Sequence, residues 1–204
     1  MSNLNVISLD NSKWGPLAWH LIHNFTIKSK SNEDMIIMIK TFGFILPCET
    51  CKKHYNYLIN DIYILDDNSS KKKIIKYLYE IHNLINSTLE KKNISFKKAL
   101  EVNEKTDNHK FIYVLIIFYS KLPYLTMSYL EFDRIYNFFV SFLKNYPSKS
   151  IQNKFKTILE TNTFQKAETP LTFRKWFIDD FRKIDFIQES YKKYNKILVK
   201  SFIK

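Results

Sequence analysis

Residues 47–54 read Pro47-Cys48-Glu49-Thr50-Cys51-Lys52-Lys53-His54 and combine a pair of cysteines with a helix start. Proline is well tolerated in the first turn of a helix, where its missing N–H has no partner to lose. We therefore predict a helix that starts at Pro47 and carries both cysteines near its N-terminus. The helix dipole and the free N–H groups favour the thiolate form of cysteine there. A disulfide across this turn would close only a small loop, which favours a redox role over a structural one.

Three interpretations of the pair remain open from the spacing alone: a redox-active dithiol, half of a zinc site, or two buried cysteines that are close by chance. Zinc is disfavoured because no second pair of ligands has the usual spacing. His20 and His23 are only three positions apart, and His54 and His82 are distant from one another. We expect no metal site.

The chain on both sides of the pair has helical periodicity, which argues against the βαβ surroundings of a thioredoxin-like motif. Ser12 and Ser31 are expected to cap the first two helices, and Gly43 to end the second. Their apolar stripes are Trp14-Leu17-Ala18-Leu21-Ile22-Phe25 and Met35-Ile36-Ile39-Phe42, and a later helix carries Ile74-Leu78-Ile81-Ile85-Leu89. Further helices are expected at Phe111–Ser120, Ser128–Lys144, Ser148–Glu160, Leu171–Phe181 and Ile184–Phe202. The predicted fold class is all-α.

Composition excludes several classes of protein. With 204 residues, two glycines and two cysteines, the chain cannot form a glycine-rich phosphate loop, a disulfide scaffold or a four-cysteine zinc site. The net charge of +12 comes almost entirely from lysine, because Arg134, Arg174 and Arg182 are the only arginines. Nucleic-acid recognition favours the bidentate arginine fork, so we do not expect a nucleic-acid partner.

The chain divides into two parts of different character. Residues 101–110 have almost no apolar side chain, which predicts one domain over residues 1–105 and a helical accessory domain over residues 106–204. The second part has no cysteine and carries 17 Lys and Arg against 9 acidic residues. No signal sequence is visible at the start, and the most apolar run has nine residues, against about 20 for a membrane span. We expect a soluble protein of a reducing compartment, the cytoplasm, with no membrane partner.

Other polar side chains are placed to form a pocket near the dithiol. Trp19 and His23 are four positions apart on one helix, as are His82 and Asn86 on another, so each pair shares a helix face. His54 lies about one turn after Cys51. These residues could line a pocket for a planar, hydrogen-bonding ring system with a charged tail.

Three stretches, taken in order, resemble the Erv/ALR family of flavin-linked sulfhydryl oxidases. They are Trp19-His20-Leu21-Ile22-His23, Cys48-Glu49-Thr50-Cys51-Lys52-Lys53-His54-Tyr55 and His82-Asn83-Leu84-Ile85-Asn86-Ser87-Thr88-Leu89-Glu90-Lys91. That family shows W-x-x-x-H, C-x-x-C-x-x-H-F/Y and H-N-x-V/I-N-x-x-L-G-K at about these separations. The resemblance extends from Lys13 to Leu100.

The resemblance implies a helical bundle of four helices and a short fifth, which binds FAD and is followed here by a second all-helical domain. It implies that Cys48 and Cys51 are catalytic, with Cys51 next to the flavin and Cys48 attacked by the substrate thiolate. The residues that it implies in FAD binding are Trp14, Trp19, His23, His54, His82, Asn83, Asn86 and Lys91. A substrate dithiol would reduce the disulfide by exchange, and the electrons would pass to the flavin and then to oxygen, giving hydrogen peroxide.

The chain departs from the family pattern at Glu90, which replaces the glycine of L-G-K, and it lacks the second cysteine pair that cellular members typically use as a shuttle. The expected partner is therefore a protein dithiol or a thioredoxin-like relay protein. The small cysteine set and the C-terminal extension resemble the oxidases of large cytoplasmic DNA viruses, which implies the host cytoplasm or the virion. Family members generally form homodimers. The alternative function is a non-enzymatic basic helical adaptor, or a nucleic-acid-binding protein, with a vestigial dithiol.

Overall fold

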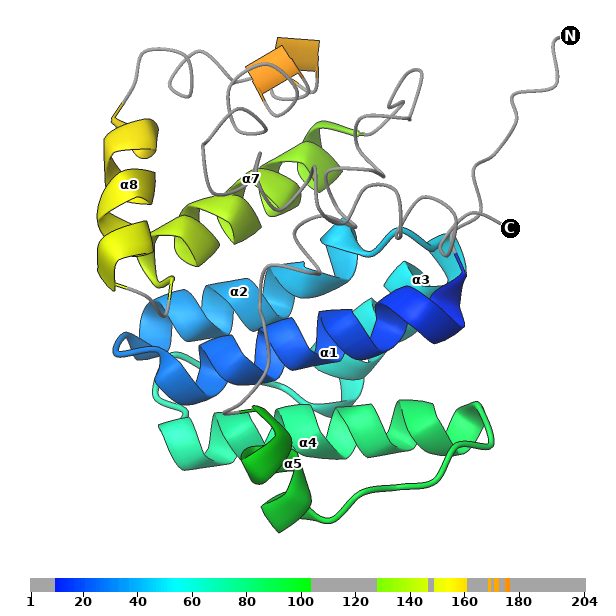
Figure 1. Ribbon diagram of the computed structural model, residues 1–204. Helices are drawn as coiled ribbons and strands as arrows, with labels where there is room; N and C mark the ends of the chain where they lie inside the picture. The colour runs from blue at the N-terminus through cyan, green and yellow to red at the C-terminus, as the bar shows by residue number, and fades with distance from the viewer. Residues whose placement is uncertain are drawn as a thin grey trace, which may run out of the picture.

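The computed structural model describes residues 10–103, 128–146, 149–160, 169, 171–172 and 175–176. The described residues form helices and no strand, which confirms the all-α prediction (Figure 1). The elements are α1 (Asn11–Lys28), α2 (Asn32–Ile45), α3 (Glu49–Tyr57), the π-helical turn η1 (Leu58–Ile62), α4 (Lys71–Thr88), α5 (Phe96–Asn103), α7 (Tyr129–Lys144) and α8 (Lys149–Leu159). The helices expected at Phe111–Ser120 and Ile184–Phe202 lie outside the described residues, as does most of Leu171–Phe181.

Helix α1 lies at the centre of the first half and contacts α2, α4 and α5, while α3 packs against α2 (Figure 1). The helices bury most of the apolar stripes expected from the sequence. Leu89 is an exception, because it lies after the end of α4 and is 57% exposed. Leu21, Ile22 and Phe25 of α1 are almost fully buried, as are Ile39 and Phe42 of α2. Burial of side chains of this size stabilises a fold by about 1.5–3 kcal/mol each. None of the described helices is both long and apolar enough to cross a membrane.

Side-chain caps set the helix starts. Ser31 caps α2, as predicted, by accepting a hydrogen bond from the Asp34 N–H at 3.2 Å. The prediction that Ser12 caps α1 is wrong. The cap is Asp10, whose carboxylate accepts from the main-chain N–H of Ser12 at 3.0 Å and from its hydroxyl at 2.7 Å. The stronger acceptor upstream takes the exposed N–H groups, so the helix starts two residues earlier than expected.

Two expectations about the second and third helices are also wrong. The cap of α3 is Cys48, whose Sγ accepts from the Cys51 N–H at 3.2 Å, so Pro47 lies before the helix and not in its first turn. Gly43 does not end α2, which continues to Ile45. Its main chain has no positive φ, and its missing side chain instead gives room to Asn56 and Tyr55 on α3. This glycine is required by close helix packing.

Helix α7 of the second half packs along α2 and lies on the side away from α4 (Figure 1). Phe138, Phe139 and Phe142 are buried in the same apolar cluster as the side chains of α1 and α2. Phe142 stacks on Phe25 of α1, with ring centroids 4.6 Å apart. The accessory segment therefore shares a core with the bundle, while the domain division at residue 105 stays a prediction.

The end of α4 contains a departure from ordinary backbone geometry. Glu90 has a φ of 55°, in the left-handed region that favours glycine. The N–H of Glu90 donates to the Ser87 carbonyl at 3.1 Å, and that of Lys91 donates to the Asn86 carbonyl at 2.8 Å. These two bonds form a Schellman motif, whose left-handed position is usually glycine. The hydrogen bonding at the end of α4 is therefore typical, but glutamate stands at the left-handed position where glycine is usual.

Replacing Glu90 by glycine should raise the free energy of unfolding by about 1 kcal/mol, because glycine adopts this conformation without the clash of a Cβ. Urea unfolding at neutral pH measures the change. The control is Glu80→Gly, within α4, which should lower stability by about 1 kcal/mol because glycine is unfavourable inside a helix. Equal effects of the two substitutions would contradict the assigned geometry of Glu90.

Candidate active site

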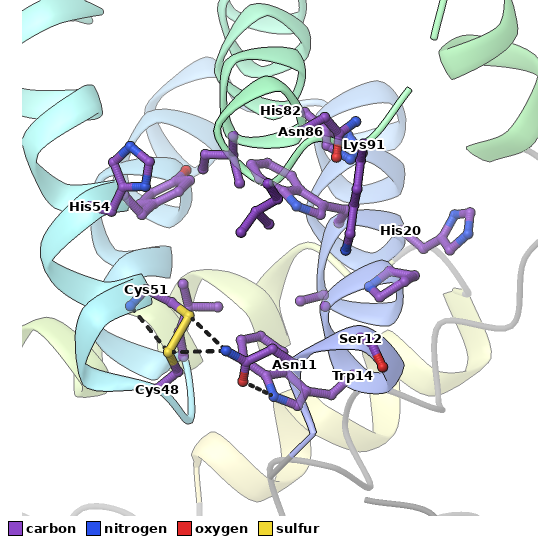
Figure 2. Close-up of a pocket in the computed structure, with 18 of the residues that line it drawn as sticks. Asn11, Ser12, Trp14, His20, Cys48, Cys51, His54, His82, Asn86 and Lys91 are labelled. Carbon is purple, nitrogen blue, oxygen red and sulfur yellow. Dashed lines mark hydrogen bonds between the residues drawn. A yellow bond between two sulfur atoms is a disulfide. The ribbon is translucent and has the colours of Figure 1, made fainter. Parts of the chain in front are cut away.

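Cys48 and Cys51 form a disulfide on the wall of a cavity of about 840 Å³. The cavity opens between the start of α1, the start of α3 and the end of α4 (Figure 2). Its walls contain every residue that the sequence predicted for the site except Asn83. They are Trp14, Trp19, His23, Cys48, Cys51, His54, His82, Asn86 and Lys91. Helices far apart in the sequence thus bring the three motifs to one place.

Three aromatic rings form the deep wall of the cavity. Trp19 and His82 are stacked, with ring centroids 4.2 Å apart and an angle of 7° between their planes. The Nε2 atom of His23 lies 3.2 Å from the Nδ1 atom of His82, so one of these nitrogens donates a hydrogen bond to the other. Stacking and hydrogen bonding fix the His82 ring in both position and tilt. The result is a flat, rigid aromatic surface beside the disulfide.

Both histidines of this pair are neutral at physiological pH. Burial, followed by the charges of His82 and His20, lowers the pKa of His23 to about 3. Burial, followed by the charges of His20 and Lys91, lowers the pKa of His82 to about 4. A neutral pair can share one hydrogen bond, whereas two charged rings would repel each other. The paired arrangement of His23 and His82 therefore requires that both rings are in their neutral form.

This pair predicts a loss of stability in acid. Unfolded histidine has a pKa near 6.5, so below that pH the unfolded chain binds protons that the native protein does not. Each of the two histidines contributes up to about 1.4 kcal/mol per pH unit, so stability should be constant above about pH 7 and fall by about 2–3 kcal/mol per unit as the pH is lowered from 6 toward 4. Urea unfolding at a series of pH values measures this slope. His82→Gln, which removes one titrating group, should give a shallower slope, and an unchanged slope would contradict the assignment.

Asn83 does not line the cavity. Its amide donates to the Ile94 carbonyl at 3.0 Å, and its side-chain oxygen accepts from the Ile94 N–H at 3.2 Å. Both of its polar groups thus bind the segment that follows α4. Ile94 itself lines the cavity, so Asn83 holds part of the wall in place from behind. A direct contact of Asn83 with a cofactor stays a prediction.

Lys91 lines the cavity although Glu90 replaces the family's glycine. The left-handed turn at Glu90 is preserved, and the lysine follows it on the cavity side (Figure 2). Glu90 is exposed and is not among the residues that line the cavity. The carboxylate therefore lies outside the space that a ligand would occupy. Lys91 supplies a cation at this end of the cavity.

Sequence reasoning missed Asn11, which lies at the start of α1. Figure 2 shows its side chain between Trp14 and the disulfide. Its amide nitrogen is 3.5 Å from Sγ of Cys48 and 3.6 Å from Sγ of Cys51, and its oxygen accepts from the Trp14 indole at 3.0 Å. No sequence motif identifies this asparagine, because its partners on α3 are 37 and 40 positions away. It becomes visible only when the starts of α1 and α3 meet.

In the part of the chain that the structure describes, no three histidine, cysteine or acidic side chains are grouped to hold a metal ion. The donors around the cavity are instead suited to an organic ligand. Two indoles and the His82 ring can stack on a flat ring system, Asn86 can hydrogen-bond it, and Lys91 can pair with phosphate. The volume falls within the range of about 300–1,000 Å³ that is usual for cofactor sites.

The sequence model of the Erv1/Alr family matches residues 16–107. A probable FAD-linked sulfhydryl oxidase of Acanthamoeba polyphaga mimivirus is 28% identical over 101 residues, which are 46% of this chain and 71% of that protein. Two relatives with names of the same kind come from Invertebrate iridescent virus 6 (31% over 94 residues; 41% and 85%) and Frog virus 3, isolate Goorha (24% over 114 residues; 49% and 75%). No solved structure matches the chain significantly.

Proposed function

Because this chain belongs to the Erv1/Alr family, we propose that the disulfide Cys48–Cys51 is the redox centre of an FAD-linked thiol oxidase and that the cavity beside it is the flavin site. The observation that carries the proposal is the position of the disulfide on the wall of a cavity lined by Trp19, His82 and Lys91. The enzyme oxidises dithiols to disulfides with FAD as its cofactor. The relatives' names and the CxxC pair both support this activity.

The residues around the cavity fit FAD. The stacked rings of Trp19 and His82 offer a flat apolar surface, and Asn86 offers an amide that can bond ring nitrogens or oxygens. Lys91 and His20 also line the cavity and would supply groups that can pair with phosphates, and Trp14 and His54 complete the walls. When bound, FAD supplies the redox chemistry by taking two electrons from the dithiol and passing them to oxygen, which yields hydrogen peroxide. The protein's own part is to hold the disulfide on the wall of the cavity.

The disulfide reacts by thiol exchange. A substrate thiolate attacks one sulfur, and the other sulfur leaves as a thiolate. We assign the attack to Cys48 and the leaving thiolate to Cys51, which precedes His54 by one helical turn. The Cys51 N–H at the N-terminus of α3 donates to the Cys48 sulfur at 3.2 Å, which supports Cys48 as the thiolate that is released when the substrate disulfide forms.

The test uses the purified full-length protein. It should be yellow, with a flavin absorbance spectrum, and it should consume oxygen when dithiothreitol is added. Trapping with a Cys51→Ala variant, in which Cys48 remains, should isolate the partner as a mixed disulfide. A colourless protein that cannot be loaded with FAD would exclude the flavin site.

We also propose a class of substrate and an oligomeric state for this protein. The described chain has one dithiol and no free cysteine, which supports a thioredoxin-like relay protein or a direct protein dithiol as the substrate. For the expected homodimer, the face of α2 that α7 covers is occupied, so two copies would associate through another face. Sedimentation equilibrium of the full-length protein tests this.

We also propose a cellular location and a division of this chain into two domains. The viral relatives support a protein of a large DNA virus that acts in the host cytoplasm or the virion. The family match over residues 16–107 supports an oxidase domain at residues 1–105 followed by an accessory domain at 106–204. The packing of α7 on α2 supports an accessory domain that is built onto the bundle and not joined by a loose tether.

A further inference from the structure

Asn11 joins the start of α1 to the redox disulfide. It is the first residue of α1, and Cys48 is the N-cap of α3, so the N-termini of two helices meet at the sulfur atoms (Figure 2). Each N-terminus carries a partial positive charge and unpaired N–H groups. A negative charge on either sulfur is therefore favoured by two helices and not by one.

The orientation of the Asn11 amide follows from its partners. The Trp14 indole is only a hydrogen-bond donor, so the atom 3.0 Å from its Nε1 must be the side-chain oxygen. The NH₂ group then faces the two sulfurs, which can only accept. Trp14 is buried, with 3% of its surface exposed, and holds this amide in place. The donor is aimed at the disulfide before any substrate binds.

The charges near the disulfide largely pair with one another. On α1, Lys13 lies 3.9 Å from Asp10, and on α3, Lys52 lies 3.8 Å from Glu49. Glu131 at the start of α7 also feels the charge of Lys52, and His54 follows one turn later on α3. The donors shown to reach the sulfurs are thus uncharged ones, the Asn11 amide and the Cys51 N–H.

We propose that Asn11 is a catalytic residue of the exchange reaction, whose amide donates to the sulfur that leaves as a thiolate in each of its two steps. This assignment rests on the proposed function.

In the first step a substrate thiolate bonds to Sγ of Cys48, the Cys48–Cys51 bond breaks, and its electron pair leaves on Sγ of Cys51. In the second step the other substrate thiolate attacks the substrate sulfur of the mixed disulfide, and Sγ of Cys48 leaves as the thiolate. The substrate dithiol loses two electrons and two protons, the cysteines gain the two electrons, and the protons pass to solvent. Asn11 reaches both leaving sulfurs at nearly equal distances.

The test is Asn11→Asp, because aspartate keeps an oxygen for the Trp14 indole and changes only the side that faces the sulfurs. The full-length protein is reduced without oxygen, and alkylation of Cys48 and Cys51 by iodoacetamide is followed separately by mass spectrometry as the pH is varied. Loss of the donor and gain of a negative charge should raise the pKa of the more reactive thiol by about one unit, which reduces its alkylation by up to about tenfold at pH values below that pKa. Asn11→Leu should give a smaller change in the same direction. Asn60→Leu, far from the disulfide on η1, is the matched control and should leave the profile unchanged.

Two results would overturn the assignment: unchanged alkylation profiles in both Asn11 variants, or a change in thermal stability without a change in the thiol pKa. If Asn11→Asp does not fold, Asn11→Ser replaces it in the alkylation experiment. Its hydroxyl is too short to bridge both sulfurs, so this variant also lacks the amide donor. The alkylation profile does not depend on flavin turnover. A shifted profile in a protein that consumes no oxygen would support the role of Asn11 and reject the oxidase.

Discussion

Cys51→Ala should lower oxygen consumption with dithiothreitol by roughly a thousandfold or more, because no other pair of thiols remains to carry electrons from the substrate. The disulfide Cys48–Cys51 uses both cysteines of the chain. Cys48→Ala should have an equally large effect, since it removes the sulfur that the substrate attacks. Rates from an oxygen electrode at saturating dithiothreitol measure both changes.

Binding and chemistry can be separated in these variants. Both should still bind FAD, because neither sulfur supplies the stacking surface of Trp19 and His82. Lys53→Ala, on an exposed position of α3 between Cys51 and His54, is the matched control and should keep normal turnover. Substantial turnover in Cys51→Ala would show that another centre carries the reaction.

Phe138→Ala should lower the free energy of unfolding by about 3–5 kcal/mol, the usual cost of removing a buried aromatic ring. Phe138 has no exposed surface and lies with its ring centroid 6.1 Å from that of Phe42 on α2. It also packs against Phe139 and Phe142 on its own helix. Urea unfolding followed by circular dichroism measures the loss.

The shape of the unfolding curve matters as much as its midpoint. Because α7 and α2 share a core, the transition should remain single and shift as a whole. Leu130→Ala, on the exposed side of α7, should change stability by less than about 0.5 kcal/mol. If Phe138→Ala shifted one of two separate transitions and left the other unchanged, α7 would not stabilise the bundle.

Local signals in the sequence predicted the helices well where the cause is local. The cap at Ser31, the helix that starts at about Ser128 and the inner part of the α4 stripe, Ile74, Leu78 and Ile81, are short-range features, and the structure confirms them. The start of α1 was misplaced because Asp10 and Ser12 can both cap, and the choice depends on which side chain meets the free N–H groups. The role of Gly43 could not be read from the sequence, because the side chains that approach it belong to α3.

In the site, too, features with a local cause were predicted and those that depend on contacts between distant segments were not. The predicted site residues were expected to converge, and all except Asn83 line the cavity. Helical spacing placed Asn83 next to His82 but could not indicate that the segment at Ile94 folds back and takes both of its polar groups. Asn11 was missed for a similar reason, since its partners depend on how α1 and α3 meet.

The three tryptophans of the chain are unevenly distributed. Trp14 and Trp19 stand on the cavity wall, whereas Trp176 is enclosed in the apolar core. Two indoles therefore sense whatever occupies the cavity, and the third senses only whether the core is intact. Tryptophan fluorescence can therefore report two separate events in this protein. A ligand in the cavity should quench the emission of Trp14 and Trp19, whereas unfolding should shift the emission of Trp176.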